Sequence, residues 1–233
     1  MRYLIILMGL ICCSPVVAQD ANGLLKQVRA KMAKVKDYVA DGMLKTDVSF
    51  MNIPDSKVKV YFRDPDQFKI VKEDGISILP KGGVSVSLNS LLSNKDFVAV
   101  AGGYTNWNNK KLAVIKLLPV QENSEVALTT LYIDEFTALV YRSTTTTRDN
   151  GTYETQLQYG RYASWGLPDK VLFTFNTRDF KLPKGVTMEY ETGKKKPAQQ
   201  KATDGKGKVD ITYSSYQINK GIPASIFSAG KNK

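Results

Sequence analysis

The side chains that most often carry out catalysis are scarce in this sequence. Histidine is absent, and the only two cysteines, Cys12 and Cys13, lie in an apolar N-terminal segment. Beyond that segment the chain lacks the usual proton shuttle, a thiol nucleophile and the strongest ligands for transition metals. We therefore expect a protein that binds a partner without transforming it, with no cofactor and no bound metal.

A catalytic centre without histidine would need a carboxylate, or a lysine of lowered pKa, as its base. The chain has no Gly-x-Ser-x-Gly nucleophile turn. Its close carboxylate pairs, Glu122 with Glu125 and Asp134 with Glu135, fall in predicted turns, where such side chains are usually solvated. An enzyme is thus the least favoured of the functions that the sequence leaves open.

Residues 1–18 have the composition of a secretory signal. Arg2 supplies the positive start, residues 4–13 form a short apolar core, and residues 16–18 are small enough for cleavage. The apolar core is shorter than a membrane-spanning helix requires. We expect cleavage before Gln19 and an exported product that is soluble in the periplasm.

A lipoprotein signal is the alternative interpretation of the same segment. It requires a small residue directly before the modified cysteine, and neither Cys12 nor Cys13 has one. The cleavable signal is therefore preferred, and residues 19–233 are predicted to form a single domain.

The chain is strongly basic, with 33 lysines and arginines against 22 acidic residues and a net charge of +11. Such a charge suits an anionic membrane surface or an acidic partner, and export argues against nucleic acid. Much of the excess lies in residues 193–208, where six lysines accompany glycine and proline. We predict a mobile loop there. The alternative is that Lys194, Lys195 and Lys196 contact anionic lipid.

The elements begin with an amphipathic helix of about four turns. Its apolar residues recur at helical spacing with basic residues between them, and Asn22 is the predicted N-cap. The apolar positions are Leu24, Leu25, Val28, Met32 and Val35.

Strands separated by turns follow the helix. Residues 57–63 show the clearest pattern, because Val58, Val60 and Phe62 alternate with polar or basic residues. The nearly all-apolar run 112–118 predicts a strand that is covered on both faces. The other predicted strands lie at 38–50, from 68 onward, 76–79, 84–88, 126–133, 138–147, 153–162, 171–175, 186–190 and 209–213.

The predicted fold is mainly β, with one long helix. About eleven strands in sequential antiparallel order predict one large curved sheet, an incomplete barrel, covered by a helical lid. The strands at 186–190 and 209–213 are predicted to pair as a hairpin around the lysine-rich loop. A short helix is predicted at 88–92.

The apolar stripes of these strands are either ordinary core or the wall of a ligand cavity. A curved sheet with one covering helix has more inward surface than that helix can fill, which favours a cavity for an acyl chain or another apolar ligand. The predicted wall consists of Val58, Val60, Phe62, Phe68, Ile70, Leu157, Tyr159, Phe173 and Phe175. The predicted lid contacts are Leu24, Val28, Met32, Leu91 and Leu92.

The order of these features resembles the LolA/RseB-like family of exported lipoprotein carriers. The resemblance covers most of residues 20–230 and contains no catalytic signature. The segments that carry it are the helix at 24–35, Tyr61-Phe62-Arg63-Asp64-Pro65-Asp66-Gln67-Phe68, Tyr132-Ile133-Asp134, Leu139-Val140-Tyr141-Arg142, Tyr159-Gly160-Arg161-Tyr162, Gly166-Leu167-Pro168-Asp169 and the stretch 219–227.

The resemblance implies an incomplete β-barrel closed by helices, whose cavity holds the acyl chains of lipoproteins bound for the outer membrane. It also implies a donor or acceptor protein in a membrane. One residue departs from the family pattern: an arginine that ties the lid to the sheet is expected directly before Pro65, and Asp64 stands there instead. Arg63 precedes it, but a shift of one place along a strand moves a side chain to the other face.

The sequence thus predicts a periplasmic carrier or chaperone for lipoproteins or lipids. A sensor or interaction module of the same fold, which reports ligand binding to a membrane partner, is the alternative.

Overall fold

The computed structural model describes six stretches of the chain. Residues 1–18, which hold the predicted signal, lie outside them, as do the predicted elements at 76–79, 84–88, 88–92 and 186–190 and most of the lysine-rich loop. The described residues are 19–47, 54–65, 67–72, 96–149, 151–176 and 206–228.

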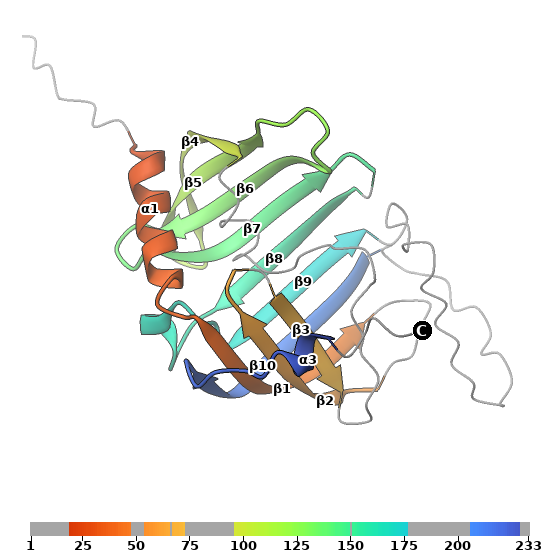
Figure 1. The fold of residues 1–233 in the computed structure, drawn as a ribbon. Coiled ribbons are helices and arrows are strands. Elements are labelled where there is room, and N and C mark those ends of the chain that lie inside the picture. The colour runs from red at the N-terminus through yellow and green to blue at the C-terminus, as the bar shows by residue number, and fades with distance from the viewer. Residues whose placement is uncertain are drawn as a thin grey trace, which may run out of the picture.

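One antiparallel sheet of ten strands dominates these residues, as predicted, and its edge strands β3 and β4 are not paired with each other. Its order is β3-β2-β1-β10-β9-β8-β7-β6-β5-β4. In Figure 1 the sheet curves so that β2 and β3 pass in front of β9 and β10. The strands are β1 (Asp37–Asp47), β2 (Ser56–Arg63), β3 (Gln67–Lys72), β4 (Phe97–Trp107), β5 (Lys110–Pro119), β6 (Val126–Asp134), β7 (Leu139–Thr147), β8 (Thr152–Gln158), β9 (Lys170–Asn176) and β10 (Lys206–Ile218).

The strand order corrects two predictions. Pairing is not sequential throughout, because β10 lies between β1 and β9 and places β3 and β4 at opposite edges. The predicted hairpin between 186–190 and 209–213 is wrong, since Val209 to Thr212 pair with β1 on one side and with β9 on the other. β10 also begins at Lys206, inside the stretch that was predicted to be loop.

The helix α1 (Ala21–Met32) is shorter than predicted and has a different cap. The side chain of Asp20, not Asn22, accepts a hydrogen bond from the backbone N–H of Gly23 at 2.8 Å. Arg29 and Lys31 occupy its last turn, where cations are favourable to the helix dipole. Figure 1 shows α1 standing at one end of the strands β4 to β8.

The burial of β2 follows its sequence pattern, and that of β5 does not. In β2 the alternating residues Val58, Val60 and Phe62 are buried, as predicted. In β5, Lys116 is exposed and Leu118 is 42% exposed, so the prediction that 112–118 is covered on both faces is wrong.

Two short elements complete the description, the 3-10 helix η1 (Ala163–Trp165) and α3 (Ser225–Ser228). Among the described residues, no helix is long and apolar enough to cross a membrane.

Candidate functional site: the inner face of the sheet

We define the inner face as the side of the sheet that carries Val60 on β2 and Leu157 on β8. Cross-strand pairing aligns its side chains in continuous rows. One row runs Tyr216–Ala40–Val60–Ile70, and its neighbour runs Ile218–Tyr38–Phe62–Phe68. Since paired residues point to the same face, each row is an apolar band across four strands.

The buried residues of this face form two clusters. The first joins α1 to β5, β6, β7 and β8 through Leu24, Leu25 and Val28 of the helix. The second joins β1, β2 and β10 and includes Phe62, Ala40 and Ile211. Val171 of β9 packs against both clusters and connects them.

All of the predicted wall residues that belong to strands lie on this face. Five of them, on β2 and β3, are in or against the second cluster, whereas Leu157 and Tyr159 belong to the first. Phe173 and Phe175 of β9 contact each other, with ring centroids 5.6 Å apart. The ring of Phe175 covers Gly207, where a Cβ atom would come within 2.5 Å of it.

The predicted lid is described only in part. Leu24 and Val28 are buried in the first cluster, and Met32 is partly buried against it. Lys31 at the end of α1 donates a hydrogen bond to the carbonyl of Thr137. Leu91 and Leu92 lie outside the described residues.

An aromatic group on β1, β2 and β10 of the inner face was not predicted from the sequence. Tyr216 contacts Tyr38 at 5.3 Å and Tyr213 at 5.0 Å between ring centroids, and Tyr38 stacks on Phe62 at 5.3 Å. A bulge in β10 brings them together, because Ser214 has no partner in the pairing of Gly42 with Tyr213 and Asp41 with Ser215. Without the bulge, strict alternation would place Tyr216 on the other face.

Burial governs the ionisation of these tyrosines. It raises the pKa of Tyr213, and it raises the pKa of Tyr216 further together with repulsion from Tyr213 and Tyr38. The hydroxyl of Tyr216 donates a hydrogen bond of 2.7 Å to the carbonyl of Pro168. The group is therefore neutral at physiological pH and keeps this part of the face weakly polar.

Buried hydroxyl groups form a second feature that the sequence analysis missed. Thr129 and Thr145 are hydrogen-bonded to each other at 3.1 Å and are 0% and 2% exposed. Ser143 and Thr155 are buried beside them in paired positions. The inner face is thus mainly apolar on β1, β2 and β3, apart from Tyr38 and Lys72, and carries hydroxyls on β6, β7 and β8.

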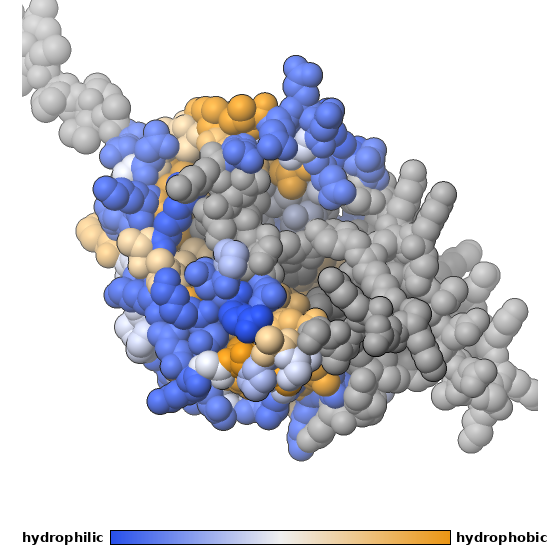
Figure 2. Space-filling view, in the orientation of Figure 1, coloured by the Kyte–Doolittle hydropathy of each residue, from blue (hydrophilic) through white to orange (hydrophobic). Residues whose placement is uncertain are grey.

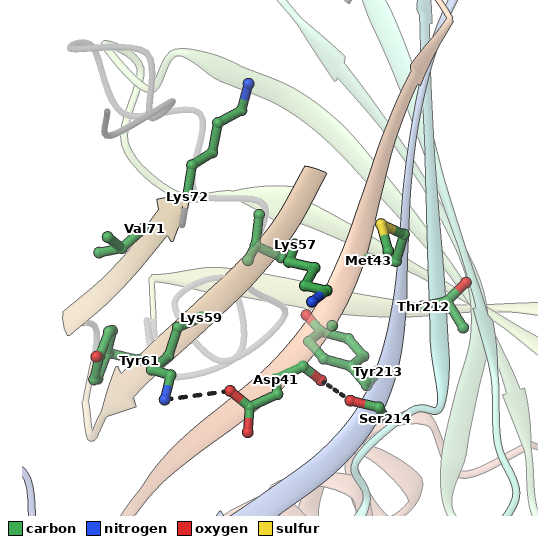
Figure 3. A pocket seen from close by; sticks show the side chains of 12 residues that line it. Asp41, Met43, Lys57, Lys59, Tyr61, Val71, Lys72, Thr212, Tyr213 and Ser214 are labelled. Atoms are coloured by element: carbon green, nitrogen blue, oxygen red, sulfur yellow. Dashed lines mark hydrogen bonds and ion pairs between the residues drawn. The ribbon is translucent and has the colours of Figure 1, made fainter. Parts of the chain in front are cut away.

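A cavity of about 620 Å³ is lined by residues of β1, β2, β3 and β10, most of them on the outer face, the side opposite to Val60. Lys57, Lys59 and Tyr61 line it and alternate along β2 with the inner-face residues. Figure 3 shows Lys59 turned toward Asp41, with Nζ and Oδ1 3.3 Å apart. Of the predicted wall residues, only Val58 borders this cavity, so it is not the predicted acyl-chain site.

Arg63 holds the C-terminal segment. Its Nη1 donates to the carbonyl of Ile222 at 3.4 Å, its guanidinium lies 5.0 Å from the ring centroid of Phe227, and Nε donates to Gln67. These partners lie in β3 and in the C-terminal segment. Asp64 forms a 4.0 Å ion pair with Lys36. Among the described residues, Arg63 therefore does not connect α1 to the sheet.

An apolar strip lies on the outer face at the β4 edge. It consists of Val98, Val100, Leu118 and Val120, which are 54%, 41%, 42% and 63% exposed. Val98 pairs with Leu118, and Figure 2 shows hydrophobic surface over this end of the molecule. Exposed aliphatic residues that cluster in this way are typical of a contact surface.

Chemistry on the described residues is limited. No group of three or more histidine, cysteine, aspartate or glutamate residues among them could hold a metal ion. The buried Asp134 accepts hydrogen bonds from the backbone N–H groups of Phe136 and Thr137, so its carboxylate caps a turn. The inner face itself carries mainly apolar side chains with scattered hydroxyls.

Comparison with solved structures identifies the fold. The chain is similar to a candidate outer-membrane lipoprotein-sorting domain from Vibrio parahaemolyticus, with a TM-score of 0.58, 9% identity and coverage of 89% of this chain and 95% of that one. It is also similar to a LolA superfamily protein from Nitrosomonas europaea, with a TM-score of 0.57, 8% identity and coverage of 90% and 98%.

A third similar structure is a DUF1329 family protein from Desulfovibrio piger, with a TM-score of 0.51, 11% identity and coverage of 91% and 99%. No protein-family model and no curated protein matches the sequence. The resemblance to LolA-like lipoprotein-sorting structures is thus confirmed at the level of the fold.

Proposed function

We propose that the protein is a carrier or chaperone that binds the acyl chains of a lipoprotein or lipid against the inner face of its sheet. The observation that supports this most is the pair of adjacent apolar rows across β10, β1, β2 and β3. Burying methylene groups contributes about 0.8 kcal/mol each. Ten methylenes would contribute about 8 kcal/mol before the cost of ordering the chain, which suffices for reversible binding.

The predicted wall and lid residues keep these roles in the proposal. The apolar side of α1 would cover the chain through Leu24, Val28 and Met32, with Leu91 and Leu92 assigned to the lid by sequence alone. Similarity to lipoprotein-sorting structures supports a periplasmic location, after removal of residues 1–18. The cargo would be received from or delivered to a membrane protein, and Lys194–Lys196 would meet anionic lipid.

Two neighbouring residues of β3 provide a matched test. Ile70 and Val71 are both partly buried, but Ile70 pairs with Val60 on the inner face and Val71 with Lys59 on the outer face. Each is replaced by serine, and lipid that co-purifies from the periplasm is measured by native mass spectrometry. We expect Ile70→Ser to lose most of the lipid and Val71→Ser to retain it. Ligand-free wild-type protein, or equal loss in both variants, would contradict the proposal.

The apolar strip favours a second candidate, a sensor or interaction module of the same fold. Val98 and Val100 are exposed on an edge strand, where a membrane-protein partner could contact them. Cross-linking in intact cells tests this with the double substitution Val98→Asp and Val100→Asp. A membrane-protein complex that is lost in the variant, while lipid binding persists, would support the sensor. A complex unaffected by the substitutions would argue against this surface.

A further inference from the structure

Lys72 is a cation on the otherwise apolar part of the inner face. It pairs with Val58 across β2 and β3, and Val58 pairs in turn with Gly42, which pairs with Tyr213. The row Tyr213–Gly42–Val58–Lys72 therefore lies directly beside the row that contains Val60 and Ile70. Figure 3 shows Lys72 extending away from Lys59 and Asp41, as the alternation of β3 requires.

The burial of Lys72 is unusual for its residue type. It is 7% exposed and is the only buried lysine or arginine among the described residues. The described carboxylates form no ion pair with it, whereas Lys36, Lys45, Lys59 and Lys170 have such partners. A buried ammonium without a counter-charge is costly, and lysine is rarely buried unless it is paired.

Tyr213 contributes a second polar group to the same row. It is 6% exposed, and its hydroxyl has no hydrogen-bond partner among the described residues. Three strand spacings of about 4.8 Å separate it from Lys72, which places their Cα atoms about 14 Å apart. Both residues, with Val58 and Gly42 of the same row, line the cavity of about 620 Å³. Gly42 between them adds no side chain.

We propose that this row binds the anionic oxygen headgroup of an acyl-chain lipid, with the Lys72 ammonium as counter-charge and the Tyr213 hydroxyl as a second donor. The site rests on the proposed function and specifies its cargo. The acyl chain would lie along Val60, Phe62 and Ile70, directly beside the row. The headgroup is a fatty-acid carboxylate or a lipid phosphate, and both present oxygens that an ammonium can bind.

The test compares palmitic acid, dipalmitoyl phosphatidic acid and uncharged monopalmitoyl glycerol by isothermal titration. Delipidated wild-type protein is compared with Lys72→Met, which removes the charge and keeps an unbranched apolar side chain one atom shorter, and with Lys59→Met as the outer-face control. A charge-assisted hydrogen bond predicts that Lys72→Met weakens the anionic ligand by about tenfold or more. The same substitution should leave the uncharged ligand unchanged, and Lys59→Met should affect neither.

The choice between carboxylate and phosphate follows from which anionic ligand loses affinity in Lys72→Met. Equal affinity of wild-type protein for charged and uncharged lipids would overturn the site, even if Lys72→Met failed to fold. An anionic preference that survives in Lys72→Met would overturn it as well. If no lipid binds to wild-type protein, the proposed function itself fails, and the two failures are thereby distinguished. Tyr213→Phe should weaken anionic binding less than Lys72→Met.

Discussion

Replacing Phe62 by alanine tests whether the inner face both stabilises the fold and contacts the ligand. Phe62 is 1% exposed, stacks on Tyr38 and pairs with Phe68. Removing a buried phenylalanine side chain costs about 3–5 kcal/mol. With a urea m-value of about 3 kcal/mol/M, the midpoint of unfolding should fall by about 1–1.7 M. Tyr61→Ala is the control, because Tyr61 is adjacent, aromatic and on the outer face.

Adding lipid separates a structural role from a binding role. A ligand at a hundred times its Kd raises the free energy of unfolding by about 2.7 kcal/mol. If Phe62 contacts the acyl chain, the stabilisation that lipid provides should be smaller in Phe62→Ala than in the wild-type protein and unchanged in Tyr61→Ala. An equal midpoint loss in both variants would refute the assignment of faces. An unchanged lipid increment in Phe62→Ala would show that Phe62 is core and not ligand wall.

Three further predictions follow from the contacts of single side chains. Asp20→Ala should lower the free energy of unfolding by about 1 kcal/mol, measured in urea, because the N-cap of α1 is lost. Arg63→Ala should release the segment around Ile222 and increase its amide hydrogen exchange, while Arg63→Lys restores only part of the protection. Tyr216→Phe should cost about 1 kcal/mol, because the carbonyl of Pro168 loses its donor. Above pH 10.0, the ordinary pKa of tyrosine, Tyr216 loses its proton in the unfolded chain and keeps it in the folded one. The free energy of unfolding should therefore fall as the pH rises, and it should fall less steeply in Tyr216→Phe. Equal slopes in the two proteins would contradict this assignment.

Strict alternation of apolar and polar residues made part of the sheet predictable. In residues 57–63 the buried and exposed positions follow the sequence directly, because every second residue is apolar and the others are mostly basic. The turn at 107–110 was equally accessible, since Asn108 and Asn109 take positive φ values of 48° and 61° and asparagine tolerates that region.

Three features carried no such signal. β4 was not predicted, because an edge strand that is largely exposed and contains Gly102 and Gly103 has little hydrophobic periodicity. The bulge at Ser214 interrupts the alternation of faces along β10, so the inner-face position of Tyr216 could not be predicted from the pattern. The central pairing of β1 with β10 joins residues far apart in sequence, and local patterns do not record such contacts. The burial of Lys72 could not be predicted either, because it depends on the register in which β3 pairs with β2.

The placement of β10 has a consequence for how the chain acquires its structure. Among the described strands, β3, β2 and β1 form one group and β9 to β4 another, and only β10 lies between the two groups. β10 is the last strand in the described chain. During synthesis the two groups must therefore wait, as separate assemblies with open edges, until β10 has emerged. The entropic cost of closing this long loop falls on the final step, so the unfinished intermediate is the stage most exposed to aggregation.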